Sequence, residues 1–127
     1  MSQKFYRCAK CGNIVAIVNV DGVNPVVCCG ETMKELVPNT SEGAGEKHLP
    51  VIEVKGNLVH VKVGSVEHPM IEAHYIQWIS IETKQGNQRK VLTPDVKPEA
   101  LFALVEGDEV LAAYEYCNLH GLWKTTL

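Results

Sequence analysis

The chain has 127 residues, with 12 lysines and arginines against 15 aspartates and glutamates and a formal net charge of -3. It is long enough for one domain, or for one domain with a small satellite. Its composition, 46% hydrophobic and 21% charged, is close to the globular average and excludes a disordered or fibrous chain. The mild acidity argues against nucleic-acid binding, and no apolar run has the length of a membrane span or the layout of a secretory leader. We therefore expect a cytoplasmic protein that binds neither nucleic acid nor membrane.

Cysteine and histidine are the unusual part of the composition, because the chain contains five of each. An odd number of cysteines without an export signal argues against a disulfide framework, since the cytosol keeps thiols reduced. So many soft or borderline ligands in a short chain point instead to metal binding.

The first 36 residues hold four of the five cysteines: Cys8, Cys11, Cys28 and Cys29. Strand-like runs at 13–20 and 24–27 flank Asp21-Gly22, a pair typical of a hairpin turn. Below roughly 40 residues a segment rarely buries enough apolar surface to fold without a metal or a disulfide. We therefore expect residues 1–36 to form a small module that its cysteines hold together.

The spacing of these cysteines indicates a metal knuckle. Two residues separate Cys8 from Cys11, so one tight turn can aim both sulfurs at one ion, and Gly12 relieves the backbone after it. Cys28 and Cys29 are adjacent, and neighbouring side chains in extended backbone point to opposite sides. The backbone must therefore bend at this pair, with a distorted tetrahedron as the expected result. Four thiolates suit zinc, as in a zinc ribbon, or iron, and the residues alone leave both open, with a disulfide as the minor alternative.

A linker at 37–47 is rich in Pro, Gly, Ser, Thr and Asn, and β-structure is indicated after it. Short runs rich in β-branched residues alternate with turn signals such as Lys55-Gly56-Asn57 and Gly86-Asn87. The runs lie at 51–54, 58–63, 75–83, 89–93, 100–106 and 110–116. The expected fold is mainly β: a small N-terminal metal-knuckle module followed over 48–127 by an immunoglobulin-like antiparallel β-sandwich.

A second set of candidate ligands lies where these runs end or loops turn: His48, His68, His74, Cys117 and His120. Loops at one end of a sandwich are where a β scaffold places chemistry. A structural zinc site closes with four ligands, whereas five suggest a redox metal with one open position, and a thiolate with several imidazoles suits iron or copper. Copper is disfavoured because no methionine follows His120. His60 is set apart, because it alternates on the same side as Lys62 and indicates a solvated strand face.

Several stretches resemble one known family. YRCAKCGNIV and VVCCGETM are similar to the desulforedoxin module, and EKHLPVIE, VEHPMIEAHYIQWI and EYCNLHGLWK are similar to desulfoferrodoxin, the two-iron superoxide reductase. The resemblance implies a rubredoxin-like Fe(Cys)4 centre on Cys8, Cys11, Cys28 and Cys29. It implies a second, catalytic iron with His48, His68, His74 and His120 as equatorial ligands and Cys117 as the axial ligand, the sixth position facing solvent.

The same resemblance implies an activity, which is detoxification of superoxide by an oxidoreductase. Superoxide would be reduced with one electron and two protons to hydrogen peroxide at a five-coordinate ferrous centre, without release of dioxygen. Lys47 would attract the anion and order water for proton delivery, and Glu46 would ligate the oxidised iron. Backbone amides around Asn118 and Leu119 are expected to hydrogen-bond the Cys117 sulfur.

Partners and alternatives complete the prediction. The resemblance implies a rubredoxin-type electron donor and a homodimer. The alternative functions are a non-enzymatic iron electron carrier and a zinc-ribbon-type interaction module.

Overall fold

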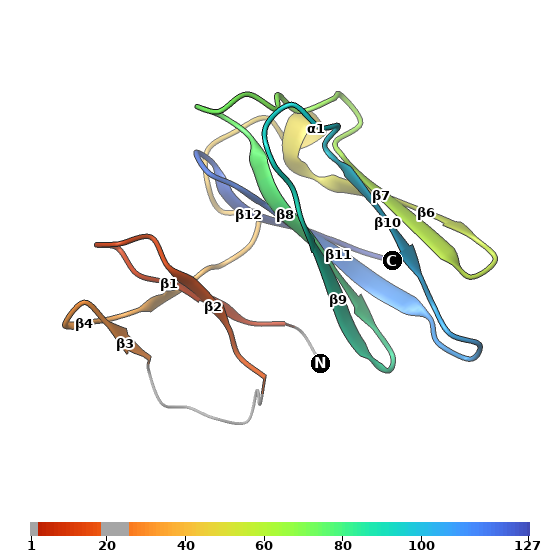
Figure 1. The fold of residues 1–127 in the computed structure, drawn as a ribbon, viewed down its shortest axis with the longest axis horizontal. Helices are drawn as coiled ribbons and strands as arrows, with labels where there is room; N and C mark the ends of the chain where they lie inside the picture. Colours follow the sequence, from red (N-terminus) through yellow and green to blue (C-terminus); the bar gives the residue numbers. More distant parts are fainter. Residues whose placement is uncertain (1–2, 19–25) are drawn as a thin grey trace. The chain divides into compact units, whose positions relative to one another are not determined.

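The computed structural model describes residues 3–18 and 26–127, so the hairpin turn expected at Asp21-Gly22 lies outside the described residues. The chain divides into two compact units, Met1–Val37 and Pro38–Leu127 (Figure 1). Strands dominate both, as expected for a mainly β protein. In the described part of the chain, no helix has the length and apolar character needed to cross a membrane.

The first unit is built from short strands. An antiparallel sheet places β1 (Phe5–Arg7) between β2 (Ile14–Ala16) and β5 (Lys34–Glu35), and a separate ribbon pairs β3 (Val27–Cys28) with β4 (Glu31–Thr32). Phe5, Cys8 and Met33 are its buried apolar side chains among the described residues. So small a core is consistent with a unit that needs a metal to fold.

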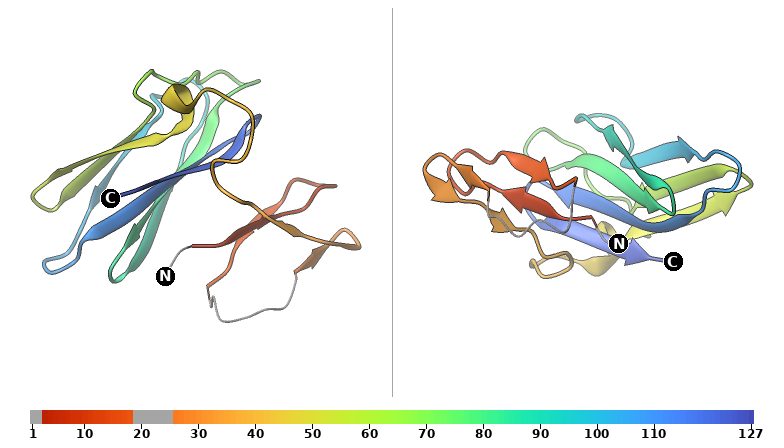
Figure 2. Two further views of the ribbon diagram at one scale, coloured as in Figure 1. Left: turned by 180° about the vertical axis from the view of Figure 1, so that it is seen from behind. Right: turned by 90° about the horizontal axis from the view of Figure 1, so that it is seen from below.

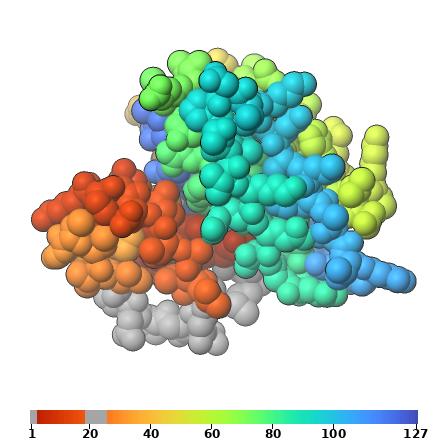
Figure 3. Space-filling view, viewed as in Figure 1, coloured from red at the N-terminus to blue at the C-terminus, as the bar shows by residue number. Residues whose placement is uncertain are grey.

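The second unit begins with one helical turn, α1 (Gly45–His48), followed by two antiparallel sheets (Figure 2). One sheet has the order β10-β7-β6, from Glu99–Ala103, Leu58–Val63 and Pro50–Lys55. The other has the order β12-β11-β8-β9, from Gly121–Thr126, Val110–Cys117, Ile76–Thr83 and Gly86–Val91. Side chains of β9 and of its connection to β10 cover much of the face of this unit that is visible in Figure 3.

The core of the second unit lies between the two sheets. In β7, Val59, Val61 and Val63 are buried and alternate with more exposed residues, because successive side chains of a strand point to opposite faces. They pack in one cluster with residues of the other sheet, including Ile79 and Ala113. His60 lies on the outer face, as expected, with its Nε2 atom 3.2 Å from a carboxylate oxygen of Glu99.

Three elements differ from the sequence expectation. β9 begins at Gly86, so the expected Gly86-Asn87 turn is part of the strand and the chain reverses just before it. β12 was not expected, yet it pairs with β11 from Cys117–Gly121 to Ala112–Thr126. The helical turn α1 falls across the end of the expected linker. In all three places the pairing partner or the packing, rather than local composition, selects the conformation.

Candidate metal centres

The four cysteines of the first unit converge on one point. Their sulfur atoms all lie within 4.8 Å of one another. The Sγ atoms of Cys11 and Cys28 are 3.6 Å apart, and those of Cys28 and Cys29 are 4.0 Å apart. A tetrahedral ion with metal–sulfur bonds of about 2.3 Å needs sulfurs about 3.8 Å apart. The residues present therefore fit a four-coordinate thiolate centre.

The expected bend at the adjacent cysteine pair is confirmed. Cys29 has a φ of 52° and Gly30 a φ of 75°, so two successive residues adopt left-handed backbone that turns both sulfurs to one side. Gly12, at φ 78°, gives the same relief after the Cys8–Cys11 knuckle.

Two of these thiols differ widely in pKa. The backbone N–H of Cys11 donates to the Cys8 sulfur at 3.5 Å and lowers the pKa of Cys8 to about 6. Contact with the Cys11 thiol raises the pKa of Cys29 to about 12. Crowded thiolates repel one another, and a bound cation removes this conflict because it stabilises all four charges.

The second ligand group is assembled at one end of the sandwich. His48 ends α1, His68 and His74 lie in the β7–β8 connection, Cys117 ends β11, and His120 lies in the turn to β12. One ligand atom from each of these five residues lies within 4.8 Å of every other, so the structure brings together all five predicted ligands.

The four imidazole rings form a closed cycle. Ring centroids are separated by 4.8 Å for His48–His68, 4.6 Å for His68–His74, 5.1 Å for His74–His120 and 4.8 Å for His120–His48. Neighbouring rings cross at 71° to 79°. Such a cycle directs four nitrogens at one centre, as four equatorial ligands of one ion require.

Hydrogen bonds of the imidazole rings indicate which ring nitrogen is free to bind a metal. The Nδ1 atoms of His48 and His68 lie 2.8 Å and 2.6 Å from the carbonyl oxygens of Ala44 and Pro69. Carbonyls only accept, so each Nδ1 donates and each Nε2, 3.2 Å from the other, is left to bind a metal. His74 Nε2 is buried and has no hydrogen-bond partner in the described part of the chain. An orphaned, inward-facing nitrogen of this kind fits a metal ligand.

Burial favours the neutral form of three of these imidazoles, and the neutral form is the one that binds metal. Burial lowers the pKa of His48 and His74 below the ordinary value of 6.5, and it lowers the pKa of His68 to about 4.

Cys117 supplies the fifth ligand atom. Its sulfur is fully buried, 3.5 Å from His68 Nε2 and 3.8 Å from His120 Nδ1. These two rings are opposite members of the cycle, so the sulfur lies over its middle, where an axial ligand would lie. Burial raises the pKa of the Cys117 thiol, and the backbone N–H groups of Leu119 and His120 counter this effect. The expected amide of Leu119 is thus confirmed, whereas that of Asn118 is wrong, because it donates to the Tyr75 carbonyl at 3.3 Å.

Two glycines near this group were not recognised as functional from the sequence. A Cβ on Gly43 would lie 3.1 Å from His48 Cε1 and 3.4 Å from His120 Cγ, so the linker backbone passes directly against two ligand rings. A Cβ on Gly64 would lie 2.5 Å from the Glu46 carbonyl oxygen, so α1 rests on the end of β7. Composition marks both only as turn glycines, since close approach of a distant segment leaves no local signal.

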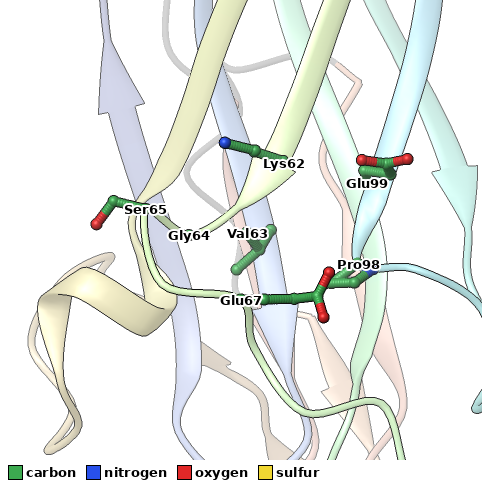
Figure 4. A pocket seen from close by; sticks show the side chains of 7 residues that line it. All are labelled: Lys62, Val63, Gly64, Ser65, Glu67, Pro98 and Glu99. Carbon is green, nitrogen blue, oxygen red and sulfur yellow. The ribbon is translucent and has the colours of Figure 1, made fainter.

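Gly64 also lines a cavity of about 100 Å³, in which the Glu67 side chain points toward Pro98 (Figure 4). A larger cavity of about 390 Å³ shares Glu67 and Pro98, and both Lys47 and the ligand His68 line it. Glu46 and Lys47 are exposed on α1, and neither belongs to the group of five.

Comparison with known proteins agrees with this arrangement. The family model "Desulfoferrodoxin, N-terminal domain" matches residues 2–36, and the model "Desulfoferrodoxin" matches residues 40–126. A desulfoferrodoxin of Nitratidesulfovibrio vulgaris is 49% identical over 121 residues, covering 95% of this chain and 94% of that protein. A superoxide reductase of Pyrococcus horikoshii is 34% identical over 109 residues, covering 72% and 94%.

Solved structures agree as well. The crystal structure of the superoxide reductase from Treponema pallidum matches with a TM-score of 0.84 at 41% identity, covering 99% of this chain and all of that one. A one-iron superoxide reductase from Giardia intestinalis matches with a TM-score of 0.55 at 34% identity, covering 65% and 97%. Desulfoferrodoxin domains bind two irons, and the two ligand groups provide a place for each. Two matching domain models and close relatives along nearly the whole chain lead to one conclusion: the chain belongs to the desulfoferrodoxin family.

Proposed function

We propose that this chain is a superoxide reductase, which reduces superoxide with one electron and two protons to hydrogen peroxide and releases no dioxygen. The observation that carries the proposal is the closed cycle of four imidazoles with one buried thiolate over its middle. These five residues would hold an iron and leave it able to bind a small anion as a further ligand.

The chain would hold a catalytic iron through His48, His68, His74, His120 and Cys117, and a second iron through its four remaining cysteines. When bound, the catalytic iron supplies the one-electron reduction of superoxide. The contribution of Cys117 is a thiolate whose charge the N–H groups of Leu119 and His120 stabilise, and such hydrogen bonds tune the potential of a metal.

Two exposed side chains complete the proposal. The Lys47 ammonium borders the cavity that His68 lines, so it lies where an anion would approach the group. Glu46 is assigned, through the family resemblance, as the residue that ligates the oxidised iron. We expect Glu46→Ala to change the vibrational spectrum of the oxidised centre by loss of a carboxylate mode while the rate of superoxide binding is kept; an unchanged spectrum would reject the assignment.

Reduction without dioxygen release consumes one external electron for each superoxide. We propose a rubredoxin-type protein as donor and a homodimer as the assembly, both by resemblance to the family. Ultracentrifugation of the purified protein tests the dimer, and a monomer at all concentrations would reject it.

The decisive experiment measures products. Protein loaded with iron and supplied with electrons should consume superoxide and form hydrogen peroxide in equimolar amounts, and evolution of dioxygen would instead indicate a dismutase. Cys117→Ala and His74→Ala should abolish the reaction. His60→Ala is the matched control, because this histidine lies on the outer face of the other sheet and should leave the reaction intact. Full activity of the first two variants would reject the proposed centre.

A further inference from the structure

The four ligand rings are not held in the same way. His48 and His68 each donate from Nδ1 to a backbone carbonyl, which fixes the ring and its tautomer. No hydrogen bond to either ring nitrogen of His74 is found within residues 3–18 and 26–127, and its Nε2 is buried. The direction of this ring is therefore set by its packing against the rings of His68 and His120 and by the backbone that carries it.

That backbone is bound by Asn118, the residue directly after Cys117. The amide nitrogen Nδ2 of Asn118 donates to the Ala73 carbonyl at 3.1 Å, and the side-chain oxygen Oδ1 accepts from the Tyr75 N–H at 2.9 Å. The Asn118 N–H also donates to the Tyr75 carbonyl at 3.3 Å. Three hydrogen bonds thus bind the residues on both sides of His74, which itself makes two backbone bonds to Ile71.

We propose that Asn118 is a positioning residue, which fixes His74 relative to Cys117 before any metal arrives. Asparagine suits the task, because a donor and an acceptor on one short side chain can bind a carbonyl and an N–H two residues apart. These hydrogen bonds join the β7–β8 connection, which carries His68 and His74, to the end of β11 and the following turn, which carry Cys117 and His120. The inference rests on the proposed function only in that this group binds iron.

The first test is the affinity of the group for ferrous iron, measured in competition with a chelator and without superoxide. Loss of a group that orients a metal ligand lowers metal affinity by roughly 10- to 100-fold, and we expect Asn118→Ala to fall in this range. In the same variant, the visible absorption of the oxidised centre that contains Cys117 and iron should shift.

The matched control is Asp108→Ala. Asp108 also accepts three hydrogen bonds, from the Thr83 hydroxyl and the Gln85 N–H across the loops and from the N–H of its neighbour Glu109, but at the opposite end of the sandwich. It should lower thermal stability as Asn118→Ala does, and leave iron affinity and absorption unchanged. Wild-type iron affinity in Asn118→Ala, or an equal loss in the control, would overturn the proposal.

A second measurement needs no variant, in case Asn118→Ala does not fold. The Tyr75 amide should be protected from hydrogen exchange in the iron-free wild-type protein, because Asn118 Oδ1 accepts from it. Rapid exchange of this amide in an otherwise folded sandwich would overturn the proposal. Failure of the proposed function can be told apart from failure of this proposal. A wild-type protein that does not react with superoxide could still show the expected iron affinities and the expected protection of the Tyr75 amide.

Discussion

At the scale of single residues, Lys47 combines nearness to a ligand with exposure to solvent. The cavity that it shares with His68 is also lined by Lys97, Glu67 and Asp95, so its two positive and two negative side chains cancel formally. In the described part of the chain, no ion pair to Lys47 or Lys97 is found. Attraction of an anion must therefore come from the position of one ammonium rather than from the net charge of the cavity.

Lys47→Ile should slow superoxide binding by about 10-fold, the lower end of what electrostatic focusing contributes. The visible spectrum of the iron should change little, since Lys47 does not belong to the ligand group. Pulse radiolysis at two salt concentrations measures both the rate and its salt dependence. Lys97→Ile, in the same cavity but away from α1, should have a smaller effect, and an unchanged rate in Lys47→Ile would reject the role of its charge.

The sequence predicts the ligands well and their supports poorly. Thiolates and imidazoles are the side chains that bind soft or borderline metals, so type and position marked as candidates all nine residues that the structure groups, and the family resemblance assigned them to two irons. Gly43, Gly64 and Asn118 act through contacts with segments far away in sequence, and these contacts depend on the finished fold. A single sequence holds no trace of them.

At the scale of elements, one-sided burial decides which strands can be predicted. β7 was expected at its observed bounds, because one face meets the core and the other meets solvent, which gives a clear alternation. β12 was missed, since Leu122 and Trp123 are buried in succession and the alternation is broken. Its conformation follows from pairing with β11 along six positions, a long-range interaction.

Gly64 lies where α1 packs against the end of β7, and its replacement should displace α1 more than the sheet. The Glu46 carbonyl accepts from Val66 N–H at 2.9 Å and would lie 2.5 Å from a new Cβ, so Gly64→Ala must push away the segment that ends in His48. We expect a lower melting temperature and weaker iron binding, measured by calorimetry and chelator competition. Gly45→Ala is the control, because its Cβ would meet only Leu49 Cδ1 at 3.6 Å. Equal behaviour of the two variants would contradict this prediction.

The far end of the sandwich has its own pH-dependent contact. Burial raises the pKa of Asp108, but hydrogen bonds from the Thr83 hydroxyl and from backbone N–H groups outweigh it and hold the pKa below 3.8. A carboxyl group whose pKa is lower in the folded than in the unfolded protein stabilises the fold at pH values above its unfolded-state pKa. This contribution is lost as the pH falls through its folded-state pKa. Asp108→Asn should therefore lower the urea midpoint of the iron-free protein at neutral pH, with a difference that narrows below pH 3.8. A constant difference at every pH would contradict the assignment.

At the scale of the whole molecule, the two units should depend on metal to different degrees. The second unit has a contiguous apolar cluster between two sheets, whereas the first has three buried apolar side chains among its described residues. Burial of a large apolar side chain such as Phe5 or Met33 stabilises a fold by about 1.5 to 3 kcal/mol, and two such side chains offset too little of the entropy lost in ordering a unit of this length. Its folding must therefore draw on metal binding.

Removing the thiolate centre should unfold the first unit alone. In a Cys11→Ala/Cys29→Ala variant, amide resonances of residues 3–18 should collapse to unfolded positions in a heteronuclear NMR spectrum, while those of the sandwich keep their dispersion. His74→Ala is the converse control, with the first unit intact and the second iron bound weakly or lost. Native resonances from the first unit in the double variant would show that its fold does not need the metal.

The ends of the sandwich are unequal in one further respect. The β6–β7 and β8–β9 turns and the β10–β11 connection lie at one end of the sandwich. The five grouped metal-ligand candidates lie at the other: His48, His68, His74, Cys117 and His120. The Gly56-Asn57 turn is two residues long, exposed and at the end of the sandwich opposite the group of four histidines and Cys117. A reporter dye, an affinity tag or an electrode linker attached there should leave the histidine and Cys117 group accessible at the opposite end of the sandwich.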